Sequence, residues 1–448
     1  MTGWLSSAGV EWSTDPAVLT ASRADRSGWP PAGRPAAVVF PDSAEQVSRV
    51  LRLAHEARTP VVPRGAGTGL SGGATAGDGT VVLDLSRMNR ILAVSPADAT
   101  AVAEPGVITA DLDRAAGEHG LRYAPDPASV AISTIGGNIA TNAGGLRCAK
   151  YGVTRDSVLG LEVVLADGRR LSTGTATLKG VTGYDLTGLF VGSEGTLGVV
   201  VRATLRLRPI PLATATVAAS FPDVEAAAAA AVALSSAGVQ PAIAELLDEA
   251  TLRAIDAAQG TSLRAAGAAL LLVQTDGAGA AVEAALIAGV LAETATSVRT
   301  TTDDAEAAEL LAARRLALPS LERIGRPLIE DIAVPRSRLA DAIREIAAIA
   351  ARHAVPIATI AHAADGNLHP LIVVDPAAET VPPEAQRAAD EIFELALKLG
   401  GTLTGEHGVG TLKRAWIGRE LGETSHDLQR QIKAVFDPHG ILNPGKAL

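Results

Sequence analysis

The chain has 448 residues, of which 47% are hydrophobic and 20% charged, a composition typical of a folded globular protein with about two or three domains. Its 39 basic and 49 acidic residues give a net charge of −10 without a long run of either sign, which argues against a nucleic-acid-binding or anionic-membrane surface. A single cysteine, Cys148, excludes internal disulfides and an iron–sulfur cluster held by cysteines of this chain alone.

The sequence also argues against a membrane-spanning or secreted protein. No segment approaches the roughly 18 uninterrupted apolar residues of a transmembrane helix. The N-terminal stretch MTGWLSSAGVEWSTD lacks the basic region followed by an apolar one that marks a secretory signal. We therefore expect a soluble, cytoplasmic protein without a transmembrane segment and without a nucleic-acid partner.

The first part of the chain combines short β-type runs with amphipathic helical patterns. Runs rich in β-branched residues predict strands at residues 36–40, 60–63, 80–86, 99–106, 159–171 and 196–209. Polar starts followed by apolar residues at helical spacing predict helices at residues 43–59 and 109–120. This mixture predicts an α+β region.

A glycine-dense loop follows the second of these strands, in the stretch PVVPRGAGTGLSGGATAGDG. Gly67, Gly69 and Gly72 match the G-x-G-x-x-G pattern of dinucleotide-binding proteins. That pattern binds a pyrophosphate only where its last glycine opens a helix, whereas here a further glycine turn and a strand follow. We therefore reject a nicotinamide site. Two interpretations remain: a nest of backbone N–H groups for an anion, with Arg64 nearby, or a surface loop without a ligand.

A second glycine-rich block favours the ligand-binding interpretation. In residues 125–152, paired glycines bracket small hydroxyl and amide side chains, in a stretch too polar for a core and too compact for a disordered linker. Such residues suit a site where the backbone lies against a flat polar ligand. A third stretch, GSEGTLGVVV at residues 192–201, repeats the pattern of glycine and hydroxyl residues running into a buried strand.

The character of the sequence changes near Pro209 and Pro211. Alanine-rich helical tracts such as VEAAAAAAVAL then alternate with strands such as AALLLVQTD, and residues 301–410 continue this second region. The alanine tracts keep helical apolar spacing, which favours ordered helix over low-complexity disorder. A polar helix at residues 425–437 leads into the final turn, DPHGILNPGKAL.

Two histidines flank an Asp-Gly pair in HAADGNLH at residues 362–369. Asp-Gly is a favoured type I′ hairpin turn, and β-branched apolar runs lie on both sides of it. A two-residue hairpin would place His362 directly opposite His369, with their Cβ atoms roughly 5 Å apart. That spacing suits a divalent metal, while two half-buried histidines bonded to backbone carbonyls are the alternative. A third ligand would decide between them.

Together these stretches resemble a known family. The segments PVVPRGAGTGLSGG, STIGGNIATNAGGLRCAKYG, GSEGTLGVV, HAADGNLHP, GEHGVGTLKR and FDPHGILNPGK are similar to motifs of FAD-binding flavoproteins of the vanillyl-alcohol-oxidase type. Within this group the likeness is to D-lactate dehydrogenases, glycolate oxidase catalytic subunits and D-2-hydroxyglutarate dehydrogenases, and it covers nearly the whole chain.

The resemblance implies an α+β fold with a two-part FAD-binding domain of the PCMH type at residues 1–211. It further implies an α+β substrate or cap domain with an antiparallel sheet and the metal site at residues 212–410. Residues 411–448 are expected to form a C-terminal segment that returns to the FAD-binding domain.

FAD is the cofactor that the resemblance implies, held non-covalently. In this family the first glycine loop and the second block hold the FAD pyrophosphate and ring. The first loop of this chain lacks the histidine that attaches flavin in some relatives. The residues carried over as flavin contacts are Pro63, Arg64, Gly65, Ala66, Gly67, Thr68, Gly69, Gly72, Pro125, Ser129, Thr134, Gly136, Gly137, Asn142, Gly144, Gly145, Tyr151, Gly152 and Asn443.

A metal and a catalytic base are implied in the same way. The metal ligands carried over are His362, His369 and Glu406, with zinc as the expected metal and manganese or iron as chemically plausible substitutes. His407, in GEHGVG, is implied as the base that takes the hydroxyl proton of a 2-hydroxy acid while C2 loses a hydride to the flavin. A purely structural role of His407 is the alternative.

Binding of the substrate carboxylate is carried over to Arg314, and a catalytic role to Asn367. Relatives often carry tryptophan three residues before the arginine, where this chain has Leu311, and Arg315 or a plain exposed arginine pair are alternatives. The hydroxyglutarate enzymes offer a lysine to a second carboxylate where this chain has Ile329. The comparison favours oxidation of a small D-2-hydroxy acid, D-lactate or glycolate, to the 2-oxo acid.

Other functions remain as alternatives: D-2-hydroxyglutarate oxidation, a flavin-free metallohydrolase, an inert cofactor-binding module of a larger complex, and the alkyl transfer of ether-lipid synthases. The alkyl-transfer enzymes carry a longer histidine run where this chain has GEHGVG. Because one cysteine provides no internal iron–sulfur relay, electrons are expected to pass to a quinone, a cytochrome, an iron–sulfur partner subunit or oxygen. A homodimer is an open option.

Overall fold

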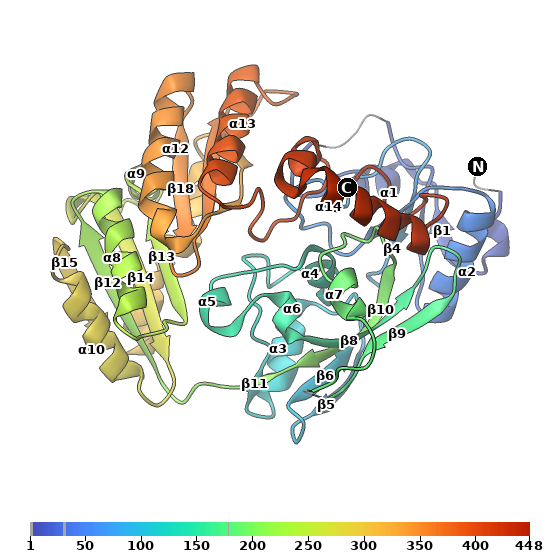
Figure 1. Cartoon of the computed structure of the whole chain (residues 1–448), viewed down its shortest axis with the longest axis horizontal. Helices are drawn as coiled ribbons and strands as arrows, with labels where there is room; N and C mark the ends of the chain where they lie inside the picture. The colour runs from blue at the N-terminus through green and yellow to red at the C-terminus, as the bar shows by residue number, and fades with distance from the viewer. Residues whose placement is uncertain (1–2, 30–32, 178) are drawn as a thin grey trace. The chain divides into compact units, whose positions relative to one another are not determined.

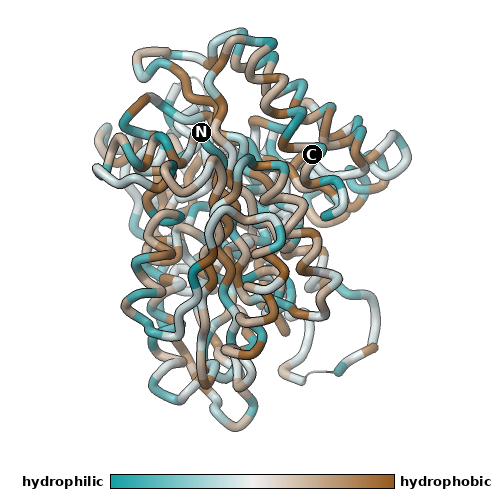
Figure 2. The backbone as a smooth tube through the Cα atoms, turned by 90° about the vertical axis from the view of Figure 1, so that its left-hand side faces the viewer, coloured by the Kyte–Doolittle hydropathy of each residue, from teal (hydrophilic) through white to brown (hydrophobic). Residues whose placement is uncertain are grey.

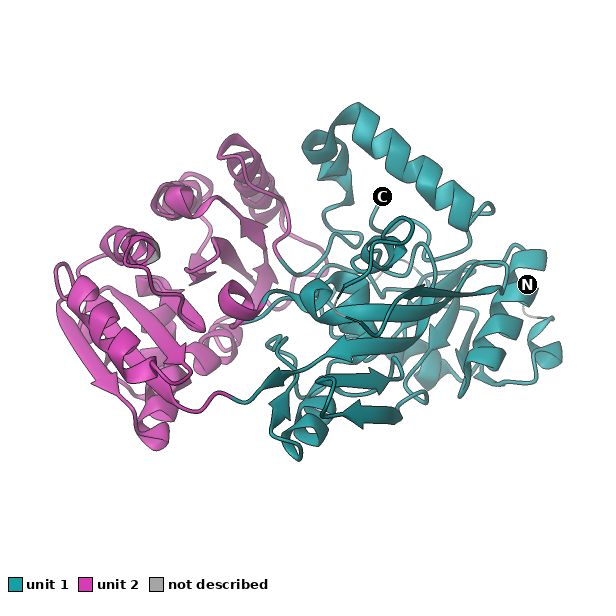
Figure 3. Cartoon of the chain, turned by 60° about the horizontal axis from the view of Figure 1, so that its bottom comes forward, with its two compact units in different colours: residues 1–145, 152–210, 406–448 teal, residues 146–151, 211–405 magenta. Residues whose placement is uncertain are grey.

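The computed structural model describes residues 3–29, 33–177 and 179–448 (Figure 1). The chain divides into two compact units, coloured separately in Figure 3. Unit 1 comprises residues 1–145, 152–210 and 406–448, and unit 2 comprises residues 146–151 and 211–405. Unit 2 is therefore built from one short and one long segment of the chain.

Unit 1 is built from short strands and mostly short helices. Its strands are β1 (Glu11–Ser13), β2 (Ala37–Phe40), β3 (Val61–Arg64), β4 (Val81–Asp84), β5 (Ile91–Ser95), β6 (Thr100–Ala103), β7 (Leu121–Arg122), β8 (Val158–Val164), β9 (Arg170–Gly174), β10 (Val199–Arg206) and β11 (Arg208–Pro209). Its helices are η1 (Leu5–Ser7), α1 (Pro16–Ala21), α2 (Ala44–Glu56), α3 (Thr109–Gly117), α4 (Ile135–Thr141), α6 (Thr154–Ser157), α7 (Leu186–Phe190), η4 (Arg414–Trp416) and α14 (Ile417–Phe436).

These strands form two sheets and one short pair. The four-stranded sheet has the order β1-β2-β4-β3, in which β1 runs antiparallel to β2 and the other neighbours are parallel. The five-stranded sheet is antiparallel, with the order β5-β6-β10-β8-β9, and β7 pairs with β11. The two sheets correspond to the two-part architecture that the resemblance implies.

Helix α2 illustrates why the sequence folds in this way. Its residues Val47, Val50, Leu51 and Ala54 recur at helical spacing, lie on one face and are buried. They share a hydrophobic core with residues of the four-stranded sheet such as Leu83. A second core covers the five-stranded sheet, whose strand β10 alternates buried residues with more exposed ones.

Unit 2 is one eight-stranded antiparallel sheet with helices packed on it. Its strands are β12 (Thr214–Phe221), β13 (Ile243–Leu247), β14 (Ala269–Asp276), β15 (Ser297–Thr301), β16 (Arg326–Ile329), β17 (Ile332–Ala333), β18 (Ile357–His362) and β19 (Asn367–Val374). Its helices are α5 (Cys148–Tyr151), α8 (Val224–Ser236), α9 (Glu249–Gln259), η2 (Leu263–Ala265), α10 (Ala280–Leu291), α11 (Asp304–Glu322), η3 (Arg336–Arg338), α12 (Leu339–His353) and α13 (Pro383–Lys398).

The strand order is β15-β12-β14-β13-β18-β19-β16, with β17 also paired to β19. Helices α9 and α11 cover one face of this sheet, because their buried residues share a core with alternate strand residues such as Leu272, Ile360 and Leu371. Helices α8 and α12 lie on the other face (Figure 1). The chain trace coloured by hydropathy shows hydrophobic residues mostly inside and hydrophilic ones along outer turns (Figure 2).

Most elements match the sequence-based predictions. The predicted helices at residues 43–59 and 109–120 appear as α2 and α3, and the α+β class with an antiparallel sheet in the second unit is confirmed. All of residues 65–80 are described and none is helical, as predicted for the glycine loop. Among the described helices, none is both long enough and apolar enough to cross a membrane.

Candidate active site

One face of the unit 2 sheet changes from apolar to polar along a row of paired residues. Ala218 pairs with Leu272, Leu272 with Glu245, Glu245 with His362, and His362 with Asn367. Directly opposed residues of antiparallel strands point to the same face, so these side chains form one row. The three polar members are buried. Because burying polar groups opposes folding unless partners are supplied, this end of the row has the character of a functional site.

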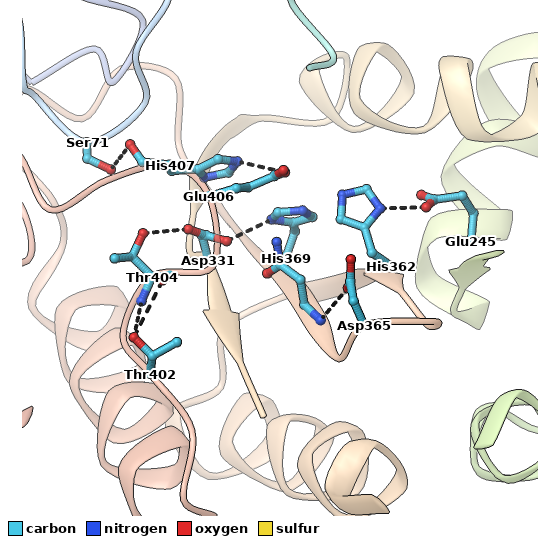
Figure 4. Close-up of polar contacts among 11 residues, drawn as sticks. Ser71, Glu245, Asp331, His362, Asp365, His369, Thr402, Thr404, Glu406 and His407 are labelled. Carbon is cyan, nitrogen blue, oxygen red and sulfur yellow. Dashed lines mark hydrogen bonds and ion pairs between the residues drawn. The ribbon is translucent and has the colours of Figure 1, made fainter. Parts of the chain in front are cut away.

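Glu245 is the acidic centre of this row. Its Oε1 accepts a hydrogen bond from His362 Nδ1 and its Oε2 accepts one from Arg314 Nε, each at 2.5 Å (Figure 4 shows the histidine bond). An ionised carboxylate only accepts hydrogen bonds, so Nδ1 of His362 is the protonated ring nitrogen. Burial works to raise the pKa of Glu245, but His362 and Arg314 outweigh it and hold the pKa below its usual value.

The hairpin that carries both histidines differs from the prediction in its register. Strand β18 ends at His362 and β19 begins at Asn367, so that His362 pairs with Asn367, and His369 pairs with Ile360. The predicted two-residue turn and the direct pairing of His362 with His369 are therefore wrong. A type I′ turn needs two residues with positive φ, and in the Asp-Gly pair only Gly366 has one, at 87°.

Both histidines nevertheless point to the same face of the sheet. They occupy diagonal positions on neighbouring strands, a relationship that still brings long side chains together. The two ring centroids lie 5.1 Å apart with the ring planes at 87°. The adjacency that the sequence predicts is present, although a different register produces it.

His369 also has an acidic neighbour. Its Nδ1 lies 3.7 Å from Oδ1 of the buried Asp331, whose Oδ2 accepts a 2.7 Å hydrogen bond from Thr404 Oγ1 (Figure 4). Each of the two buried histidines thus has a carboxylate beside its Nδ1, Glu245 in the case of His362. Histidines that bind metals commonly place their second ring nitrogen against a carboxylate, so this donor set fits a divalent cation.

Asn367 lies against the end of the segment that leads to Glu406. A Cβ atom added to Gly405 would lie 2.5 Å from Asn367 Oδ1, so glycine is required there. This Oδ1 is buried and has no hydrogen-bond partner among the described protein atoms. A buried amide oxygen without a donor is rare, and it marks a place where a ligand or a water donates.

Arg314 and Arg315 have different surroundings in α11. Arg314 is partly buried and bound to Glu245, whereas Arg315 is exposed and donates to the carbonyl of Ala308. The structure therefore brings Arg314 to the polar row and leaves Arg315 on the surface. Because Glu245 binds the Nε–H of Arg314, the two terminal NH₂ groups of the guanidinium remain as donors.

Glu406 and His407 belong to unit 1. The carbonyl of His407 accepts a 3.2 Å hydrogen bond from Ser71 Oγ in the glycine loop, and Glu194 accepts one from the N–H of Gly410 (Figure 4 shows the first). His407 Nε2 lies 3.8 Å from Glu406 Oε1. The predicted substrate domain extends to residue 410, whereas Glu406 and His407 belong by their contacts to unit 1.

The two glycine-rich blocks meet in unit 1. A Cβ atom on Gly65 would lie 2.3 Å from Thr134 Oγ1, and one on Gly136 would lie 2.6 Å from Pro105 Cβ. Thr134 is the N-cap of α4 and accepts a 3.2 Å hydrogen bond from the N–H of Gly137. Backbone packed this closely leaves its remaining N–H groups accessible to a ligand without intervening side chains.

A cavity of about 550 Å³ opens beside this junction, within the size range of small-molecule sites. Ala66 and Thr134, two of the predicted flavin contacts, line it. Its other lining residues, which are not among the predicted flavin contacts, are Ser86, Asn89, Ile91, Gly106, Val107, Ile108, Asp111, Arg114, Ala115 and Glu118. In the sequence, the glycine of AEPG could have indicated close backbone packing beside this cavity, since a Cβ atom on Gly106 would lie 2.4 Å from the carbonyl oxygen of Leu85.

The terminal NPGK turn lies against the glycine loop of unit 1. Asn443 is buried, and its amide nitrogen donates to the carbonyls of Gly73 at 2.9 Å and Glu194 at 2.7 Å. Its backbone N–H donates to the carbonyl of Val61 at 2.8 Å. Asn443 thereby holds three segments of unit 1 together.

Two further predicted flavin contacts bind protein groups. Arg64 folds over the glycine loop, where its Nη1 donates to the carbonyl of Ala74 at 3.2 Å. Tyr151 lies in α5 of unit 2, where its hydroxyl donates to Asp276 Oδ2 at 2.6 Å. The remaining predicted flavin contacts all lie in unit 1: Pro63, Gly67, Thr68, Gly69, Gly72, Pro125, Ser129, Asn142, Gly144, Gly145 and Gly152.

Comparison with known proteins finds relatives along almost the whole chain. Residues 210–447 match a family described as FAD linked oxidases, C-terminal domain, and residues 35–174 match an FAD binding domain. The chain is 45% identical over 417 residues to glycolate oxidase subunit GlcD of Bacillus subtilis, covering 92% of this chain and 88% of that protein. It is 38% identical over 417 residues to a D-lactate dehydrogenase of Archaeoglobus fulgidus, covering 92% and 91%.

Among solved structures, 4-ethylphenol oxidase from Gulosibacter chungangensis superimposes with a TM-score of 0.78 at 22% identity, over 97% of this chain and 94% of that one. At this level of identity the match shows a shared fold.

Proposed function

The chain belongs to the FAD-linked oxidases, and we propose that it oxidises a small D-2-hydroxy acid, glycolate or D-lactate, to the 2-oxo acid. It is an FAD-linked oxidoreductase, so the hydrolase and inert-module alternatives are wrong. The observation that carries the proposal is the buried row of Glu245, His362 and Asn367, with Arg314 beside it, all within residues 210–447, which match the C-terminal domain of this family.

FAD is proposed to bind unit 1 without a covalent link. Residues 64–72, at the start of the glycine loop, offer backbone N–H groups to the pyrophosphate, and the cavity beside Ala66, Gly106 and Thr134 can take a further part of the nucleotide. When bound, FAD supplies the acceptor for the hydride that leaves C2 of the substrate. The chain's part is to hold the cofactor by close backbone contact, which the glycines permit.

A divalent metal, expected to be zinc, is proposed to bind His362, His369 and Glu406. Two imidazoles and one carboxylate with an open position form a donor set of catalytic metal sites, and both imidazoles have a carboxylate beside the other ring nitrogen. Glu406 follows directly after Gly405, the last residue of unit 2. When bound, the metal supplies a Lewis acid that lowers the pKa of the substrate hydroxyl.

Substrate binding and proton removal are proposed to involve Arg314, His407 and Asn367. The two terminal NH₂ groups of Arg314 suit a bidentate contact with the substrate carboxylate. A ring nitrogen of His407 takes the hydroxyl proton as hydride leaves. Asn367, whose amide oxygen is buried without a donor among the described protein atoms, accepts a hydrogen bond from bound substrate or water.

The residue at the end of β16 favours a small substrate. D-2-hydroxyglutarate carries a second carboxylate that needs its own cation. Where the hydroxyglutarate enzymes offer lysine, β16 ends in Ile329, which pairs with Leu371 of β19. The monocarboxylates glycolate and D-lactate are therefore preferred, and the electrons then pass to an external quinone, cytochrome, iron–sulfur subunit or oxygen.

The test is anaerobic mixing of the purified holoprotein with glycolate, D-lactate, L-lactate or D-2-hydroxyglutarate, while the flavin absorbance is followed with and without a chelator. We expect glycolate or D-lactate to bleach the flavin and the chelator to slow that bleaching. Bleaching by D-2-hydroxyglutarate alone would assign the alternative substrate. No bleaching by any of these acids would overturn the proposal.

A further inference from the structure

We propose that Glu245 is a positioning residue that sets both the ring tautomer of His362 and the orientation of Arg314. The proposal rests on the function proposed above and deepens it, because it names a residue that acts through a metal ligand and through the carboxylate-binding arginine. Glu245 is fully buried, and its two oxygens serve different partners: Oε1 accepts from His362 Nδ1 and Oε2 from Arg314 Nε, each at 2.5 Å.

The backbone around Glu245 is held firmly. Strand β13 lies between β14 and β18, and Glu245 pairs with Leu272 on one side and with His362 on the other. All five residues of β13 are buried. A carboxylate in the middle of such a strand opposes folding unless it is paired, so folding alone does not favour glutamate here. The position is better explained by what the carboxylate does for its two partners.

For His362 the consequence is a fixed tautomer. Because the carboxylate accepts from Nδ1–H, the lone pair of the neutral ring resides on Nε2. This histidine would therefore hold a metal through Nε2, and its contact with Glu245 already orients the ring for that role. Without Glu245 the ring could rotate or carry its proton on Nε2, and both changes weaken metal binding.

For Arg314, the hydrogen bond to Glu245 fixes the plane of the guanidinium group. A guanidinium is planar, so a hydrogen bond at Nε sets the direction in which its terminal NH₂ groups point. The side chain leaves α11 next to Ala313, which packs in the core between this helix and the sheet. One carboxylate thus couples the residue proposed to bind the substrate carboxylate to a residue proposed to bind the metal.

The principal test is Glu245→Gln in the full-length protein with FAD bound. A glutamine can accept with its oxygen but presents NH₂ where the second donor lies, so it cannot serve His362 and Arg314 together. We expect the affinity of the metal-stripped protein for Zn²⁺, measured by competition with a fluorescent chelator, to fall about 10- to 100-fold. FAD content should match wild type. The KM for the hydroxy acid should rise as the guanidinium loses its fixed direction.

The matched control is Glu249→Gln. Glu249 is a partly exposed glutamate of the same unit, ion-paired with Arg253 and Arg264 on the surface. The Glu249→Gln variant loses the same charge as Glu245→Gln, but Glu249 is ion-paired with neither histidine nor Arg314. The Zn²⁺ affinity of this variant should therefore equal that of wild type. Equal Zn²⁺ affinities for wild type, Glu245→Gln and Glu249→Gln would overturn the proposal.

A second variant separates positioning from a structural ion pair. Glu245→Met combined with Arg314→Met removes both charges, a replacement that proteins often tolerate without loss of stability. If Glu245 only balanced the arginine, Zn²⁺ affinity would return to the wild-type value, and the proposal would fail. We expect the affinity to stay low, because the Glu245 carboxylate that binds His362 Nδ1 is still absent.

The tautomer can be read directly from the NMR spectrum of protein labelled with ¹⁵N-histidine. The chain has eight histidines, and the signal of His362 is the one that disappears in His362→Asn. The metal-stripped wild type should show the Nδ1–H form, and the double variant should not. If wild type itself bound no Zn²⁺, the proposed metal site would be wrong, whereas the tautomer would still decide the role of Glu245. An Nε2–H ring in the wild type would overturn it.

Discussion

The carboxylate of Glu194 accepts a 2.8 Å hydrogen bond from the backbone N–H of Gly410, across 216 residues of sequence. Its other oxygen accepts one of 2.7 Å from the N–H of Val409. Glu194 is buried, and burial raises its pKa although both hydrogen bonds act in the opposite direction. A Cβ atom on Gly408 would lie 3.1 Å from the same carboxylate. Glu194 therefore fixes the backbone of the turn that carries His407.

Glu194→Gln is expected to loosen this turn. The amide nitrogen of glutamine cannot accept a hydrogen bond, so one buried N–H loses its acceptor, at a cost of about 1–3 kcal/mol in the free energy of unfolding. Flavin reduction should slow because His407 is held less firmly. Urea unfolding and anaerobic flavin reduction measure the two effects. Glu423→Gln, an exposed change on α14, is the control, and equal results for both variants would contradict the prediction.

His407 and Glu406 should respond differently to substitution. His407→Asn removes the proposed base and should slow flavin reduction roughly 10²- to 10⁴-fold, with metal and FAD contents close to wild type. Glu406→Gln removes a charged ligand and should lower the metal content first. Elemental analysis of the purified variants and stopped-flow flavin reduction provide the data. If both substitutions release the metal equally, His407 belongs to the metal shell instead.

The flavin is expected to leave the denatured chain intact. The glycine loop contains no histidine or cysteine side chain that could attach the ring. Acid or heat precipitation of the yellow protein should therefore release FAD into the supernatant, where its fluorescence and chromatographic mobility identify it. Flavin that stays with the precipitated chain would mean a covalent link elsewhere.

The sequence predicted elements well and their pairing less well. The apolar periodicity of α2 and the β-branched runs around His362 are local signals, and both elements formed where expected. The hairpin register depended on the turn, in which the N–H groups of Asp365 and Gly366 both donate to the carbonyl of His362. That turn holds four residues, and the Asp-Gly pair alone did not reveal it.

The polar partners of the candidate site illustrate the same limit. Glu245 lies 117 residues before His362, and only the register of β13 against β18 brings the two together. A local signal did exist, because an acidic residue stands inside the apolar run PAIAELL. Asp331 gives a weaker signal in PLIEDIAVP, because it follows Glu330 and lies between β16 and β17. An ionisable residue in a strand whose neighbours are all apolar is a useful marker of a site, even where its partner cannot be predicted.

Lys446 is expected to make the free energy of unfolding change with pH in the alkaline range. Burial lowers the pKa of Lys446 to about 8, with Asp25 and Glu194 acting in the opposite direction. Its Nζ donates to the carbonyl of Thr75 and to Asn443 Oδ1. Between about pH 8 and the ordinary lysine value near 10.5, the unfolded chain binds more protons than the folded one. The free energy of unfolding contributed by this residue therefore rises with pH across that window.

Lys446→Met removes this titration, so the difference in unfolding free energy between wild type and variant isolates it, since other lysines and tyrosines titrate in both proteins. The difference should favour the variant most below pH 8, where the wild type carries a buried charge. It should then shift towards the wild type as the pH approaches 10.5. Urea unfolding at several pH values measures it. A difference that is flat across this range, or that moves towards the variant, would show that Lys446 is not titrating as its burial implies.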